Sequence, residues 1–243
     1  MIKSNYDCRQ YVLLCVYILR VSFVFKDGAD MGRKNQAYFY LKNQILNNEI
    51  PQGSPLREME IAAALNMSRT PIREALRELE AEGVIISYPS RGTFVTTITP
   101  YDVEEIGELR ILSEVWALEK GFNRITTDEI DEMVNAFKAA SEPFDWQQYH
   151  EVDRAFHQMI IDKSGSRRLA GFVETLNTQI ERIRRYGAED PSRANFTLTE
   201  HLVILKCMRE KDLPGARRAL KSHLQSVSSS AMECCRNMIC QRK

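Results

Sequence analysis

The sequence predicts a mostly α-helical protein with an N-terminal winged helix-turn-helix domain and a C-terminal all-α helical bundle. Two observations predict this fold class. Three short helical runs are followed by a β-branched stretch interrupted by turn residues, all before residue 99. From there on, apolar residues recur at helical spacing without an internal repeat. We therefore expect one domain over residues 31–98 and another over 99–240, preceded by an apolar extension over 1–30.

Composition favours a globular protein whose contact with any nucleic acid is local. The chain has 243 residues, of which 44% are hydrophobic and 27% charged, enough for two ordinary domains with buried cores. Lys plus Arg and Asp plus Glu both number 33, which excludes a generally basic nucleic-acid-coating protein. The six cysteines show neither a CxxC spacing nor a disulfide framework, so we expect reduced thiols and a cytoplasmic location.

The extension over residues 1–30 contains "YVLLCVYILRVSFVF" at 11–25, which is nearly all apolar. A membrane span needs about 20 apolar residues, whereas this run is shorter and contains Arg20. No small-residue cleavage site follows it. Met31 starts a stretch typical of a soluble domain, so we expect the extension to be dispensable and no membrane partner. A membrane-tethered adaptor is an alternative that depends on 11–25 alone.

The third helical run, "SRTPIREALRELEAEGVI" at 68–85, carries a row of arginines beside its packing face. Thr70 is the expected N-cap, with Pro71 at the first helical position. At about 100° per residue, Arg69 and Arg73 fall beside the apolar stripe, with Arg77 one turn further on. Arginine binds guanine or phosphate through its planar fork. The alternative is a solvated face whose arginines pair with glutamates four residues away.

The stretch that follows, "VIISYPSRGTFVTTI" at 84–98, predicts a small hairpin with its turn in the "PSRG" segment. Three helices and a hairpin are the order of a winged helix-turn-helix. In that fold one helix enters the major groove of double-stranded DNA, while the hairpin tip lies against the backbone or minor groove.

The stretch "LREMEIAAALNMSRTPIREALRELEAEGVIISYPSRGTFV" at 56–95 resembles the DNA-binding domain of the GntR superfamily of bacterial transcription regulators. The resemblance implies a homodimer that binds a pseudo-palindromic operator. Two positions depart from the family pattern: Met59 stands where Arg is frequent, and Asn66 where Gly is frequent. Met59 cannot donate a hydrogen bond, so one base contact of the family is missing and the operator sequence can differ. The resemblance assigns the DNA contacts to Arg69, Thr70 and Arg73 of the recognition helix and to Arg91 and Gly92 of the wing tip.

Six helices are expected after residue 98. The first begins with Thr99 as N-cap and Pro100 at its first position, and it runs to Gly121. The later boundaries are expected at residues 126–127, 141–144, 163–166, 186–192 and 212–215. A helical domain of this size can hold a ligand between its helices.

All four histidines of the chain lie in this second part. Asp153 and His157 are four residues apart and share a helix face, while His201 and His223 come from two later helices. Three imidazoles and a carboxylate from separate helices can hold a divalent transition metal. Ordinary core or surface histidines are the competing interpretation.

The segments "EVDRAFHQMI", "TEHLVILKCMREKD" and "ARRALKSHL" resemble the metal-binding FCD domain of the FadR branch of GntR regulators, in its six-helix VanR-like group. This resemblance implies that Asp153, His157, His201 and His223 bind Zn²⁺, Ni²⁺ or Mn²⁺. His150 has no role in the family pattern.

Arg110 matches a family arginine near the effector pocket, where its fork can bind a small carboxylate effector. A surface salt bridge with Glu114, four residues later, is the competing interpretation. The sequence therefore predicts a DNA-binding transcription regulator rather than an enzyme, acting as a repressor whose operator affinity is changed by an organic acid. The alternative is a helical metalloenzyme that uses the Asp/His cluster to activate water.

Overall fold

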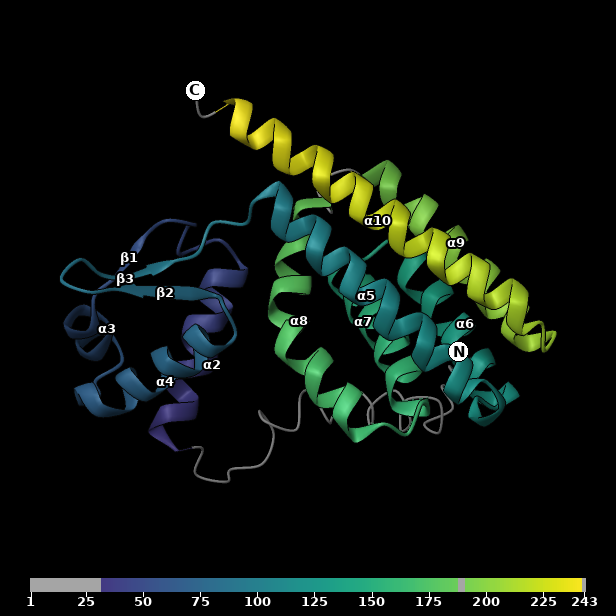
Figure 1. Cartoon of the computed structure of the whole chain (residues 1–243), viewed down its shortest axis with the longest axis horizontal. Coiled ribbons are helices and arrows are strands. Elements are labelled where there is room, and N and C mark those ends of the chain that lie inside the picture. Colours follow the sequence, from purple (N-terminus) through teal and green to yellow (C-terminus); the bar gives the residue numbers. More distant parts are fainter. Residues whose placement is uncertain (1–31, 188–190, 242–243) are drawn as a thin grey trace, which may run out of the picture.

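The computed structural model describes residues 32–187 and 191–241, which form two domains side by side (Figure 1). Expectations for residues 1–30 lie outside the described residues. The helices and strands are α2 Arg33–Leu46, β1 Pro55–Leu56, α3 Glu58–Ala64, α4 Arg69–Ala81, β2 Ile85–Tyr88, β3 Gly92–Val95, α5 Pro100–Gly121, the 3-10 helix η1 Phe122–Arg124, α6 Thr127–Ser141, α7 Trp146–Lys163, α8 Arg167–Gly187, α9 Pro191–Arg209 and α10 Leu213–Gln241.

The smaller domain is the expected winged helix-turn-helix. Its helices α2, α3 and α4 pack around a core that includes the fully buried Leu41, Ile72 and Leu79. β2 and β3 form the antiparallel hairpin, and the short strand β1, which was not anticipated, pairs with β3 to give the order β1-β3-β2. Burial of one face of α4 leaves the other side of this helix exposed.

The recognition helix α4 begins at Arg69, two residues earlier than the sequence suggested. Its N-cap is Ser68, in extended conformation, so the assignment of Thr70 as N-cap was wrong. Ser68 makes no side-chain capping hydrogen bond. Pro71 still fits because the amides of the first helical turn have no partner within the helix, and the proline lacks only such an amide.

The larger domain contains six α-helices, α5 to α10, in the described residues, as expected. α5 starts as predicted, with Pro100 at its first position and a capping box in which Thr99 and Asp102 satisfy each other's backbone amides. The long helix α10 packs along α5 and α9 (Figure 1). Within the described residues, every helix is too short or too polar to cross a bilayer.

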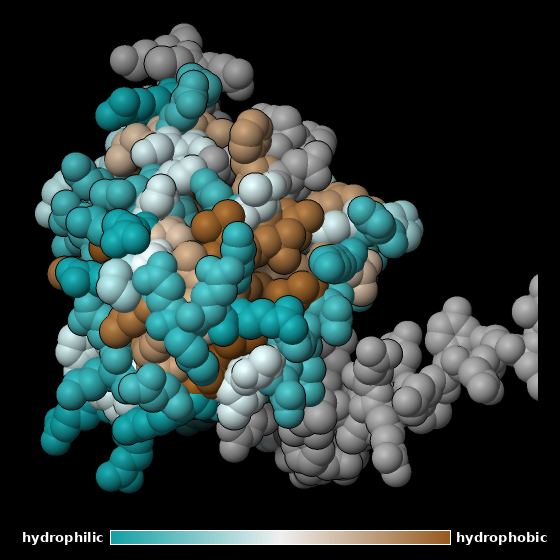
Figure 2. All heavy atoms as spheres, turned by 90° about the vertical axis from the view of Figure 1, so that its right-hand side faces the viewer, coloured by the Kyte–Doolittle hydropathy of each residue, from teal (hydrophilic) through white to brown (hydrophobic). Residues whose placement is uncertain are grey.

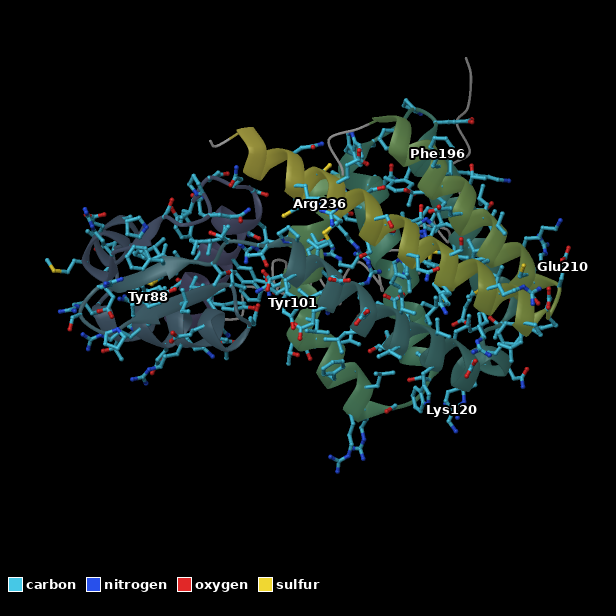
Figure 3. The ribbon with its side chains drawn as sticks, turned by 45° about the horizontal axis from the view of Figure 1, so that its top comes forward. Tyr88, Tyr101, Lys120, Phe196, Glu210 and Arg236 are labelled. Atoms are coloured by element: carbon cyan, nitrogen blue, oxygen red, sulfur yellow. The ribbon has the colours of Figure 1, made fainter. Side chains whose placement is uncertain are left out.

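Helix α8 connects the two domains through hydrogen bonds to the backbone that follows α4 and β3. Gln179 Nε2 donates to the carbonyl oxygen of Gly83, at 2.6 Å. The buried Arg182 donates to the hydroxyl of Thr96 at 2.8 Å and to its carbonyl oxygen at 2.5 Å. One helix of the larger domain therefore contacts the end of the recognition helix. Tyr101, near the start of α5, lies at the same junction (Figure 3).

Candidate metal centre and DNA-facing surface

Four side chains from three helices converge in the core of the larger domain. α7 carries Asp153 and His157 on one face, one turn apart, while α9 supplies His201 and α10 supplies His223. All four are buried, and one potential ligand atom of each lies within 4.8 Å of those of the others. The structure therefore brings together the four residues that the sequence singled out.

The distances show that the Nε2 atoms of the imidazoles face a common centre. Asp153 Oδ1 lies 3.6 Å from His157 Nε2 and 3.2 Å from His201 Nε2. His223 Nε2 lies 3.3 Å from His157 Nε2. Two such nitrogens repel unless a proton or a cation lies between them, so the arrangement favours a positive charge at the centre.

The opposite nitrogen of each ring is held by a second residue. The partners are Glu114 Oε2, 2.5 Å from His157 Nδ1, Glu200 Oε2, 2.9 Å from His223 Nδ1, and the Tyr149 hydroxyl, 3.4 Å from His201 Nδ1. A carboxylate at Nδ1 places the ring proton there and leaves the Nε2 lone pair for a ligand bond. The rings of His157 and His223 are therefore oriented as metal ligands usually are.

The donor atoms at the centre fit a metal ion by protonation as well as by position. His201 Nε2 is buried and makes no hydrogen bond among the described residues, although Asp153 is near. Burial lowers the pKa of His201, and burial together with His201 holds the pKa of His223 well below its usual value. Both rings are neutral near pH 7, as metal binding requires. The four donors could hold one ion.

Two arginines keep the carboxylates of this region ionised. Burial alone would raise the pKa of Asp153, but Arg184, whose Nη1 lies 3.3 Å from Asp153 Oδ2, and the nearby imidazoles hold it well below its usual value. Glu114 is also buried, yet Arg110 and His157 lower its pKa to about 2. The carboxylates of Asp153 and Glu114 are therefore charged next to the imidazoles.

Arg110 forms an ion pair with Glu114, but this pair is buried and not on the surface. Arg110 Nε lies 2.9 Å from Glu114 Oε1, and both side chains are less than a tenth exposed. Arg110 Nη2 is buried without a hydrogen-bond partner among the described residues. Arg110 also lines a cavity of about 60 Å³, room for several waters, together with Asp153, His157 and His223. A buried donor thus remains beside the cavity.

His150 lines the same cavity and stacks on Trp146, with ring centroids 5.2 Å apart. It is not one of the four converging residues. Sequence reasoning missed Glu200, Arg184 and Tyr149 as neighbours of the cluster, because each comes from a position with no motif of its own. Glu114 could be found only through its spacing from Arg110.

On the smaller domain, the predicted DNA contacts are exposed at one end of α4 and at the hairpin tip. Arg69 and Arg73 are 54% exposed, and both pair with Glu58 of α3 and not with glutamates of their own helix. Thr70, Arg91 and Gly92 are exposed as well. Arg69, Thr70 and Arg73 lie at the N-terminal end of α4. Arg91 and Gly92 lie at the turn between β2 and β3.

Comparison with known proteins identifies the family to which this chain belongs. The family described as bacterial regulatory proteins, gntR family, matches residues 33–95, and the FCD domain matches residues 105–226. The chain belongs to the GntR family of bacterial regulators. Its FCD domain places it in the FadR-type branch. Membership in the six-helix VanR-like group stays a prediction, with which the six helices of the larger domain agree.

Other transcription regulators match along most of the chain. The HTH-type transcriptional regulator in unstable DNA locus of Streptomyces ambofaciens is 30% identical, over 81% of this chain and 84% of that protein. The HTH-type transcriptional repressor RspR of Escherichia coli K12 is 27% identical, over 82% and 88%. A solved GntR regulator from Rhodococcus sp. RHA1 has the same fold, with a TM-score of 0.69, 20% identity and coverage of 83% and 98%.

A solved structure described as the metal-free FCD domain of a transcriptional regulator shares the fold of the larger domain, with a TM-score of 0.53, 22% identity and coverage of 57% of this chain and 96% of that one. GntR proteins are transcription regulators and not enzymes. This chain is therefore a DNA-binding transcription regulator, and the metalloenzyme alternative is not supported.

Proposed function

We propose that the protein is a cytoplasmic repressor that binds a pseudo-palindromic operator as a homodimer and changes its operator affinity when a small carboxylate binds beside a metal ion. The observation that carries the proposal is the unpartnered Nη2 of Arg110, next to a cavity that the Asp/His cluster also lines. A buried donor without a partner is costly, so a ligand oxygen is the expected occupant.

Asp153, His157, His201 and His223 would hold the ion. Imidazole and carboxylate donors suit Zn²⁺, Ni²⁺ or Mn²⁺. An ion held by these four donors would act as a Lewis acid toward a carboxylate oxygen of the effector. The fork of Arg110 would take the second carboxylate oxygen, because Arg110 uses only its Nε for Glu114.

The DNA-binding part of the proposal assigns base or phosphate contacts to Arg69, Thr70 and Arg73 and backbone contacts to Arg91 and Gly92. Their exposure supports it, as does the geometry by which a helix N-terminus reaches base edges. The name of RspR as a repressor supports the direction of regulation. We assign the DNA contacts to a domain over residues 31–98 and the effector site to a domain over residues 99–240. The GntR match falls within the first of these ranges and the FCD match within the second.

Self-association is supported by apolar side chains on the surface of the larger domain. Leu112 of α5 is 68% exposed and Phe196 of α9, labelled in Figure 3, is 67% exposed. Figure 2 shows apolar side chains gathered toward the middle of one face of the molecule, with polar ones around them. Burial of such residues against a second copy would place two recognition helices on one operator.

The test starts from DNA that the purified protein selects from mixed genomic fragments. Organic acids are then screened by thermal shift, and operator release is measured for each hit in wild type and in Arg110→Lys. This variant keeps a cation beside Glu114 but removes the planar fork. We expect weaker acid binding with unchanged DNA affinity in the absence of acid. Acids that stabilise both proteins equally, or that never alter DNA affinity, would refute the effector mechanism.

A further inference from the structure

One carboxylate binds two of the three arginines of the recognition helix, Arg69 and Arg73. Glu58, the first residue of α3, accepts hydrogen bonds through the same oxygen, Oε2, from Arg69 Nη2 at 2.8 Å and from Arg73 Nε at 2.9 Å. The arginines are one turn apart on α4. Glu58 therefore restrains both guanidinium groups from a neighbouring helix.

This arrangement is poorly suited to stabilising the fold. Both arginine side chains are 54% exposed and Glu58 is 30% exposed, and ion pairs at such positions contribute little to folding. Glu58 stays ionised near neutral pH, because hydrogen bonds from Arg69 and Arg73 lower its pKa against the opposing effect of burial. A fixed negative charge thus lies on the surface that faces DNA.

The restraint leaves the donors that read bases available. A guanidinium group has five N–H donors, and Glu58 takes one from each arginine. Arg73 is bound through Nε, so the pair of terminal nitrogens remains for a bidentate contact to O6 and N7 of guanine. Arg69 is bound through Nη2, so its Nε and Nη1 donors remain. Two guanidinium groups held in one geometry lose less side-chain freedom when they bind the correct bases.

The same charge opposes contacts that carry no sequence information. Affinity for any duplex rises with the number of phosphates that cations neutralise. A carboxylate between two arginines offsets part of their charge and repels phosphates. Sequence-independent binding should therefore be weaker with Glu58 than without it.

We propose that Glu58 is a positioning residue that sets the selectivity of DNA binding, by aligning Arg69 and Arg73 for base contacts and by weakening their attraction to phosphates. This inference rests on the proposed role of the two arginines in DNA contact.

The experiment compares Glu58→Gln with Glu60→Gln, a matched control. Glu60 lies on the same helix, is exposed, and pairs with Arg57 at 2.8 Å, away from the recognition helix. The probes are a duplex that the wild type enriches from a random-sequence library and a scrambled duplex of equal composition, each titrated at several salt concentrations. Melting temperatures of the variants verify that they fold.

For Glu58→Gln we expect tighter binding of the scrambled duplex, with a salt slope steeper by up to about 1. The ratio of affinities for selected and scrambled duplex should fall about fivefold or more, the factor that matches the weakest bidentate base contact. Glu58→Asp keeps the charge on a side chain one methylene shorter. It should lower the ratio while the salt slope stays at the wild-type value.

The inference would be overturned if the ratio of affinities for selected and scrambled duplex were unchanged in Glu58→Gln. It would also be overturned if this ratio fell equally in Glu60→Gln, because loss of any negative charge on α3 would then explain the effect. If the wild type enriches a duplex and the ratio does not respond to Glu58, only the role of Glu58 fails. If the wild type enriches no sequence, the proposed function fails and this inference fails with it.

Discussion

At the scale of single residues, the cluster of Asp153 and three histidines is defined as much by its supporting partners as by its four members. Glu114 and Glu200 each hold the Nδ1 of one imidazole, so the rings are oriented before any ion arrives. Supporting partners of this kind strongly affect metal affinity. The cluster therefore leads to a prediction about metal content that distinguishes ligand histidines from other histidines of the domain.

We predict that purified protein contains about one transition-metal ion per chain and that His201→Ala or His223→Ala abolishes it, since each removes one donor of four. His150→Ala is the matched control, because His150 lines the same cavity but lies outside the converging set. It should retain the ion. Elemental analysis measures all four proteins. Wild-type protein without metal that also fails to take up Zn²⁺, Ni²⁺ or Mn²⁺ would contradict the metal site.

At the scale of secondary structure, α8 is an element that contacts both the candidate metal centre and the smaller domain. Arg184 pairs with Asp153 at the centre, and Ile183 and Arg184 line the cavity. A few residues earlier on the same helix, Gln179 and Arg182 bind the backbone next to the recognition helix. Because a helix moves largely as a unit, a change at the cavity that displaces α8 would also displace the end of α4.

We therefore expect the double variant Gln179→Ala, Arg182→Lys to uncouple the sites. Metal content, acid binding and operator affinity without acid should stay near wild type. The acid-induced change in operator affinity, typically 5- to 150-fold for such coupling, should fall toward 1. Asn177→Ala, an exposed change on the same helix, is the control. Operator titrations with and without the acid found by screening measure the effect, and a double variant that responds like wild type would exclude this route.

At the scale of the whole molecule, both family matches lie between residues 33 and 226, after the apolar extension over residues 1–30. The first described helix, α2, begins at Arg33, and its Leu41 is buried in the core of the smaller domain. Both family domains therefore lie in the part of the chain after Met31.

A protein that starts at Met31 should be as soluble as the full chain and should bind the same genomic fragments with the same affinity. The physical reason is that the described cores of both domains are built from residues after 31. Solubility measurements and fragment-binding titrations on the two proteins check this. Aggregation of the shorter protein, or loss of its DNA binding, would mean that residues 1–30 have a structural role.

Much of the fold was accessible from local sequence. The capping box at Thr99, the helix that ends at Gly121 and the hairpin strands β2 and β3 all follow from short-range patterns. The N-cap of α4 was predicted wrongly because Ser68 and Thr70 are both good caps and only the path of the preceding turn selects between them. The two-residue strand β1 has too few residues to show a pattern of its own.

By itself, the sequence determined the two-domain order and the row of arginines on the recognition helix, because these depend on spacing along the chain. The four candidate metal ligands followed from the resemblance to the FCD domain, since spacing alone placed only Asp153 and His157 on one helix face. Only the tertiary structure decided that Glu58 binds both Arg69 and Arg73, that the ion pair of Arg110 is buried, and that α8 contacts both the metal centre and the smaller domain. Some of these contacts are between residues on different helices, such as Glu58 and Arg69. The ion pair of Arg110 lies within one helix, and its burial depends on the helices packed around it. Sequence spacing constrains neither property, because each is set by how the helices pack.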